Sequence, residues 1–248
     1  MWSVGSGVTT SGTDVTEWSA LSGGLKTFTN SGGSYSQYLT GGPNGTSYID
    51  LSGSSLYSSD PLWGDGAFAS NNSTCGKKHM FMVVKLPTTG TQTLWSNAYN
   101  TNGAFGGGTT VQFNPASTQI TTIHSYYHST GTKIETRTTN SPHISGLAGY
   151  ENGEWALIDS TLGGANDIYV NGTQYTSGIT KGGTGNVGSD SVMCSHSNQP
   201  LPQPKNGFQI GGPGTNDTFA VAELILYSSI KTSSEAASIR SYLNDKYQ

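Results

Sequence analysis

Short apolar stretches alternate with polar turn clusters along the whole chain. The stretches are rich in β-branched and aromatic residues, and Gly, Asn, Ser and Pro separate them. This pattern is typical of an all-β protein and predicts about ten or more strands. The clearest predicted strands are Ser47 to Leu51, His79 to Leu86, Thr91 to Ser96, Thr109 to Phe113, Gln119 to Tyr127, Lys133 to Thr138, Glu154 to Ser160, Asp167 to Tyr175, Gly207 to Gly211 and Phe219 to Tyr227.

Two stretches are apolar at nearly every position, Met80 to Val84 and Ala220 to Leu226. A strand with one solvated face alternates apolar and polar residues, so an unbroken apolar run predicts a strand that is covered on both faces. We expect these two strands at the centre of the core. A third stretch contains Asn171-Gly172 between two strand-like runs, which favours a type I′ hairpin turn.

The period of the pattern changes near the C-terminus. Thr232 and Glu235 have the spacing of a helix capping box, and apolar residues then recur at helical intervals. A helix of about 13 residues is marginal by itself, so it must dock its apolar stripe on the sandwich. The stripe consists of Ala236, Ile239, Leu243 and Tyr247.

Length and composition are those of one exterior-type domain. The chain has 248 residues and only 10% of them are charged, against roughly 25% in an average soluble protein. All-β sandwiches of this size commonly form one domain. We expect residues 1–14 to form an N-terminal arm and residues 15–248 a single β-sandwich domain.

Charge and cysteine content exclude several classes of protein. The net charge is −4 and the Lys and Arg residues are scattered, so no basic stripe is present to bind nucleic acid. No run is long enough for a transmembrane helix, and no export signal follows Met1. Cys75 and Cys194 are the only cysteines; they form either one disulfide or separate buried thiols, and the sequence does not decide between these.

Four stretches of the chain resemble concanavalin A-like and laminin-G-like domains. They are Val15 to Gly23, Asn44 to Leu51, Ile168 to Gly172, and Phe219 to Tyr227 with the helix that follows. Many phage and bacterial surface proteins have endings of this type. The resemblance implies an all-β, two-sheet antiparallel jelly-roll sandwich with a short C-terminal α-helix, in which one sheet is concave and often binds glycans.

Glycosidases on this scaffold need two carboxylates about 5 to 10 Å apart. The Glu-x-Asp-x-x-Glu pattern of one such family is absent. Glu151 and Glu154 flank an Asn-Gly turn, which predicts that both face solvent. Glu223 lies in an apolar strand, where a lone acid usually makes a structural hydrogen bond. A clear partner for a buried Glu223 would weaken a non-enzymatic interpretation.

Related polysaccharide lyases combine Arg, Gln, His and Tyr on neighbouring strands. Gln119 and His124 are five residues apart, so an unbroken strand puts them on opposite faces. Arg137 and Arg240 are the only arginines, and Arg240 lies in the predicted helix. The lyase pattern is therefore disrupted, and we expect no catalytic residues.

Glycan binding requires aromatic rings together with amide or carboxylate groups, and the chain has both in quantity. For each candidate, ordinary packing is the competing interpretation. The glycan-binding candidates are Trp63, Trp95, Tyr99, Asn100, His124, Tyr126 and His128. Weaker candidates for a Ca²⁺ site are Asp60, Asp65, Asn166 and Asp167, without the regular spacing of a known loop. We expect no cofactor, and Ca²⁺ is the only one left open.

These observations favour a non-enzymatic virion structural protein of a tailed phage, such as a capsid decoration, knob or tail-fibre component. Its expected location is the virion surface or the extracellular medium. Its expected partners are other virion proteins, further copies of itself and glycans. The alternatives are a lectin module of a secreted protein and an atypical polysaccharide lyase or glycoside hydrolase.

Overall fold

Among the residues that the structure describes, the protein is all-β apart from one α-helix at the C-terminus. The computed structural model describes residues 1–21, 27–31, 34–58, 78–96, 100–101, 104–105, 108–116, 119–128, 131–138, 153–162, 168–174, 180–182, 208–211, 218–227 and 229–247. Within these ranges, eighteen strands are connected by antiparallel pairing into one network, and two more form a separate pair. No helix in these ranges has the length and apolar character needed to cross a membrane.

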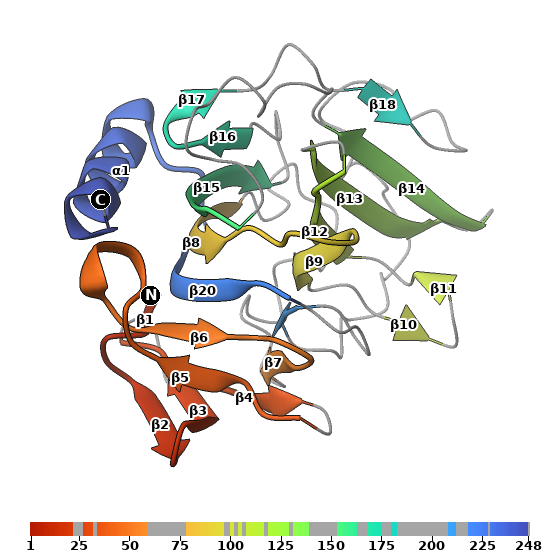
Figure 1. Ribbon diagram of the computed structural model, residues 1–248. Coiled ribbons are helices and arrows are strands. Elements are labelled where there is room, and N and C mark those ends of the chain that lie inside the picture. The colour runs from red at the N-terminus through yellow and green to blue at the C-terminus, as the bar shows by residue number, and fades with distance from the viewer. Residues whose placement is uncertain are drawn as a thin grey trace.

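The elements follow one another along the chain as short strands joined by turns (Figure 1). In order they are β1 (Trp2–Ser3), β2 (Val8–Ser11), β3 (Asp14–Ser19), β4 (Thr27–Ser31), β5 (Gln37–Leu39), the 3₁₀ turn η1 (Pro43–Gly45), β6 (Tyr48–Asp50), β7 (Ser55–Ser58), β8 (Lys78–Lys85), β9 (Gln92–Ser96), β10 (Asn100–Thr101), β11 (Ala104–Phe105), β12 (Gly108–Asn114), β13 (Gln119–His128), β14 (Gly131–Thr138), β15 (Trp155–Leu162), β16 (Ile168–Val170), β17 (Thr173–Gln174), β18 (Thr180–Gly182), β19 (Phe208–Ile210), β20 (Ala220–Tyr227) and α1 (Ser233–Tyr247).

The pairings arrange the strands in two layers. The first layer has the order β17–β16–β15–β8–β20–β6–β5, with β1 added beside β20. The second layer has the order β18–β14–β13–β12–β9–β19–β7–β4–β3–β2. The layers join at β3, where Asp14 pairs with Gln37 of β5 while Glu17 to Ser19 pair with β4. This two-layer arrangement is the antiparallel sandwich that the sequence predicts.

Strand β8 shows how the core is built. Met80, Met82 and Val84 belong to a cluster of buried side chains from both layers. Phe81 and Val83 point the other way and pack beneath α1. The unbroken apolar run therefore has both faces covered, as predicted. Each such side chain contributes about 1.5–3 kcal/mol of burial free energy.

Helix α1 lies over the outer face of the first layer (Figure 1). Its start is the predicted capping box, because Glu235 accepts a hydrogen bond from the Thr232 backbone N–H at 2.8 Å and its own N–H donates to the Thr232 hydroxyl at 3.3 Å. Ala236, Leu243 and Tyr247 are buried against the sheet, and Ile239 packs beside them. The predicted helix and its docking are confirmed.

Strand β20 contains an irregularity that changes which side its residues face. Val221 pairs with Val84 and Glu223 pairs with Val83, so Ala222 is the extra residue of a β-bulge. Val221 and Leu224 lie in the core between the layers, whereas Ala222 packs beneath α1. Simple alternation would direct Glu223 between the layers, and the bulge turns it towards the helix instead.

The other local predictions agree with the structure. Each of the ten predicted strand ranges contains a strand, and the hairpin turn has φ of 50° at Asn171 and 82° at Gly172, as a type I′ turn requires. The Asn171 side chain also accepts the Leu157 backbone N–H at 2.8 Å.

The N-terminal residues 1–14 were expected to form an arm. In the structure they contain β1, which pairs with β20, and β2, which pairs with β3.

Candidate functional site

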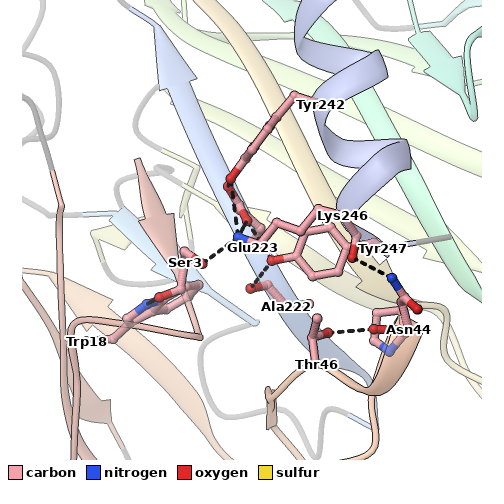
Figure 2. Close-up of polar contacts among 10 residues, drawn as sticks. Ser3, Trp18, Asn44, Thr46, Ala222, Glu223, Tyr242, Lys246 and Tyr247 are labelled. Atoms are coloured by element: carbon pink, nitrogen blue, oxygen red, sulfur yellow. Dashed lines mark hydrogen bonds and ion pairs between the residues drawn. The ribbon is translucent and has the colours of Figure 1, made fainter.

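The acid that the sequence singles out, Glu223, is buried between β20 and α1 (Figure 2). Only 1% of its surface is exposed. The Lys246 ammonium and the Tyr247 hydroxyl each donate to its Oε2 at 2.6 Å. Lys246 also donates to the Ser3 hydroxyl at 2.9 Å, which includes β1 in the same network. The carboxylate therefore joins the last turn of the helix to the centre of the first layer.

Three groups at or near this network have pKa values that differ from their usual values: Tyr247, Lys246 and the Met1 amino group. Burial raises the pKa of the Tyr247 hydroxyl, and the hydrogen bond to Glu223 raises it further. Burial lowers the pKa of Lys246, but the hydrogen bond and charge of Glu223 outweigh burial, so the pKa stands above its usual value. Burial lowers the pKa of the Met1 amino group, and the charge of Glu223 opposes this change.

A second buried carboxylate, Asp159 of β15, binds α1 near the middle of the helix. Arg240 of α1 donates to its Oδ2 at 2.6 Å through Nε. His79 contacts its Oδ1 through Nε2 at 2.5 Å. The Lys231 backbone N–H donates to His79 Nδ1 at 3.2 Å, so this nitrogen carries no proton and the proton is on Nε2. Both ring nitrogens of His79 are thus engaged in structural hydrogen bonds.

These two clusters have the chemistry of attachment points between helix and sheet. Glu223 does have clear partners, but they are an ammonium group and two phenols of the docked helix; no carboxylate of the described residues is among them. General acid–base catalysis needs a group with a proton site directed at a substrate. The Asp159 carboxylate and the His79 ring nitrogens bind instead to each other, to Arg240 and to the Lys231 backbone.

The outer face of the second layer is different, because a row of polar side chains crosses it. Each member sits directly opposite the next on the neighbouring strand, and side chains that are directly opposite in an antiparallel pair share a face. We name this set the polar row; it consists of Thr9, Glu17, Thr29, Tyr57, Gln209 and Ser96.

The outward direction of the polar row follows from its neighbours in sequence. Trp18, Phe28 and Leu56 lie in the core between the layers, and each is adjacent to a member of the row. Side chains alternate along a strand, so the row faces away from the core. Thr9 and Thr29 are exposed, Glu17, Tyr57 and Gln209 are half-buried, and Ser96 is buried.

The polar row offers hydroxyl, amide and carboxylate groups beside one tyrosine ring. The Gln209 amide donates to Ser55 at 2.8 Å, and Glu17 accepts from the Ser19 hydroxyl at 2.6 Å, which holds both side chains in place. Neighbouring strands are about 4.8 Å apart, comparable to the length of one pyranose ring. Hydroxyl and amide groups both donate and accept hydrogen bonds, as sugar hydroxyls require.

The structure places few of the predicted site residues in one region. Trp95 is fully buried, and its ring stacks on Phe208 with centroids 5.1 Å apart, so it offers no ring face to a ligand. His124, Tyr126 and His128 lie on β13. Asn100 lies on β10.

The remaining predictions lie outside the described residues. These are Trp63, Tyr99, the Ca²⁺ candidates Asp60, Asp65, Asn166 and Asp167, the cysteines Cys75 and Cys194, and Glu151. Glu154 is exposed next to a turn at Gly153. Among the described residues, no group of three or more His, Cys, Asp or Glu side chains is placed to hold a metal ion.

No protein-family model and no curated protein matches this chain. The candidate site therefore rests on geometry. Glu17, Tyr57 and Gln209 were not predicted from the sequence, although each lies next to a large apolar residue, and this alternation is the signal that predicts outward-facing positions. Asp159 and His79 were not predicted either, because single polar residues in apolar strands give no indication of their partners.

Proposed function

We propose that the chain is a non-enzymatic structural protein of a tailed-phage virion, such as a capsid decoration, knob or tail-fibre component, that adheres to glycans through its second layer. The observation that carries this proposal is the difference between the two outer faces of the sandwich. Helix α1 packs on β8, β15 and β20 of the first layer through apolar contacts and through two ion pairs whose carboxylates are buried. The second layer carries the polar row.

The chemistry of the polar row supports glycan adhesion. Its groups are mostly uncharged donors and acceptors, and Glu17 is its only charged member. The half-buried Tyr57 supplies an aromatic surface in the middle of the row, next to the Gln209 amide on the neighbouring strand. Aromatic rings with a polar group at one edge suit ligands that are part apolar and part hydroxylated, as sugars are.

The use of the buried carboxylates supports a non-enzymatic role. Glu223 and Asp159 are each neutralised by a cation from α1, at 2.6 Å in both cases. Both are covered by the helix rather than placed on the polar row. An acid that is committed in this way to a structural ion pair is a poor proton donor to a bound sugar.

The composition supports an exterior location on the virion. Only 10% of residues are charged, and 35 of the 248 are glycine. Purified phage particles test this placement: mass spectrometry should detect the chain in stoichiometric amounts, and its absence from intact particles would contradict the virion assignment. Binding of the pure protein to a glycan array tests adhesion, and an array with no signal above background would contradict it.

The polar row also favours a second candidate, a lectin module of a secreted protein. This alternative uses the same glycan-binding face. The only difference is that the face would belong to a secreted protein and not to a virion. Glycan binding by the pure protein together with absence from phage particles would favour the lectin. Neither result depends on the resemblance to concanavalin A-like domains.

A further inference from the structure

Strand β2 is the last strand of the second layer in the part of the chain that the structure describes. Among the described strands it pairs only with β3, and Figure 1 shows it at the periphery of the molecule. Thr9, Thr10 and Ser11 are all exposed. An edge strand of this kind presents unpaired backbone N–H and C=O groups to any strand that approaches it.

The hydrogen bonds of the hairpin determine which backbone groups are free. The carbonyl of Gly7 accepts the Ser19 N–H at 2.8 Å, and the carbonyl of Thr9 accepts the Thr16 hydroxyl at 3.0 Å. Residues 7 and 9 therefore direct their backbone groups towards β3. The register of this hairpin shifts between Thr9 and Thr10, because Thr16 of β3 is an extra residue opposite a regular β2. Backbone groups alternate along β2, so Val8 and Thr10 direct theirs outward.

The edge at β2 lacks the features that protect other edges of this protein. Natural edge strands are very short or carry charged residues or proline, which prevents pairing with another chain. Strand β17 has only two residues, and β18 contains Lys181. Strand β2, with the sequence Val-Thr-Thr-Ser, has neither a charge nor a proline. A β-bulge, which also protects edges, does occur in this hairpin, but its extra residue is Thr16 of β3 and not a residue of β2.

We infer that β2 is a pairing site for β2 of a second copy of this chain, related by a two-fold axis through Thr9. In this arrangement Val8 of each copy exchanges both backbone hydrogen bonds with Thr10 of the other. The two Thr9 side chains meet directly opposite each other in a non-hydrogen-bonded pair, a favourable threonine–threonine contact. The second layers of the two copies then form one continuous sheet.

A second copy fits this edge without electrostatic repulsion. The nearest like charges on the shared face are the two Glu17 carboxylates, which lie three strand spacings apart, about 14 Å. This exceeds the screening length of about 8 Å at physiological salt. The two polar rows also become collinear, because Thr9 is the last member of each.

Sedimentation velocity over a concentration series, up to about 1 mM, tests this pairing, since an interface this small predicts weak association. The wild-type protein should show a monomer–dimer equilibrium. Thr9→Lys places two ammonium groups opposite each other and should weaken association at least about tenfold. Thr173→Lys, on the exposed edge strand β17, is the matched control and should leave association unchanged.

Two further variants keep the test decisive. Thr10→Pro removes only an outward N–H, so it should abolish the dimer at an unchanged melting temperature. Thr9→Cys should form an intermolecular disulfide under mild oxidation, mapped by mass spectrometry to the peptide containing position 9, whereas Thr173→Cys should not. A wild-type protein that stays monomeric at about 1 mM, or a dimer that Thr9→Lys does not weaken, would overturn the inference.

Discussion

Lys246 donates a 2.6 Å hydrogen bond to Glu223, and this contact fastens the last turn of α1 to the central strand of the first layer. It exists because the bulge at Ala222 turns Glu223 towards the helix. Removing one partner of a buried ion pair leaves the other charge desolvated, which costs more than the pair contributes. The two partners differ in burial, since Glu223 is buried and Lys246 is half-buried.

The first prediction follows from this difference. Lys246→Met leaves a buried carboxylate without its cation and should lower the free energy of unfolding by about 3 kcal/mol. Glu223→Gln should lower it less, by about 2 kcal/mol. The double variant Glu223→Gln/Lys246→Met should be more stable than Lys246→Met alone. Urea unfolding of all four proteins gives these values, and additive effects of the two changes would show that the pair is not coupled.

The second prediction concerns alkaline pH. The pKa of Tyr247 is raised in the folded protein by burial and by its hydrogen bond to Glu223. The resulting stability is present below the ordinary tyrosine pKa of about 10 and is lost as the pH rises through the folded value. Between about pH 9 and pH 11, the unfolding free energy of the wild type should therefore fall more steeply than that of Tyr247→Phe. Parallel pH profiles would contradict the assigned hydrogen bond.

The third prediction concerns the capping box of α1. Thr232→Ala removes the hydroxyl that accepts the Glu235 N–H and should cost about 1 kcal/mol, whereas Thr232→Ser should cost little. Hydrogen bonds from Thr232 lower the pKa of Glu235, so its stabilising effect is lost as the pH falls through the folded value. Thermal melts should therefore show a smaller difference between wild type and Thr232→Ala below about pH 4. A difference that grows on acidification would contradict the cap.

Local patterns were enough to predict an all-β protein with one C-terminal helix, whereas the two-sheet arrangement was expected from the family resemblance. The unbroken run in β8 and the helical stripe of α1 each imply their own burial, because both signals come from neighbouring residues. Strands β1 to β5 and β7 were not among the predicted strands, since most of them are short and all but β5 contain Ser or Thr. Their strand structure depends on pairing with distant parts of the chain.

The candidate site depended on information that a sequence pattern does not contain. The polar row is defined by register across separate strands, such as Tyr57 opposite Gln209, which are far apart in the chain. The burial of Trp95 could not be predicted either, because an aromatic residue next to Ser and Asn is equally compatible with core packing and with a glycan-binding surface. The bulge at Ala222 reverses the side that alternation assigns to Glu223.

The central claim is that the polar row, and not the helix-covered face, binds glycans. Tyr57→Ala and Tyr242→Ala make a matched test, because Tyr57 lies in the row and Tyr242 is 44% exposed on α1. Each variant would be titrated with the glycan that gives the strongest array signal. The account predicts at least about tenfold weaker binding for Tyr57→Ala, since stacking on one aromatic ring is worth on the order of 1 kcal/mol or more, and unchanged binding for Tyr242→Ala. Equal affinity of Tyr57→Ala and wild type, or a loss confined to Tyr242→Ala, would contradict it.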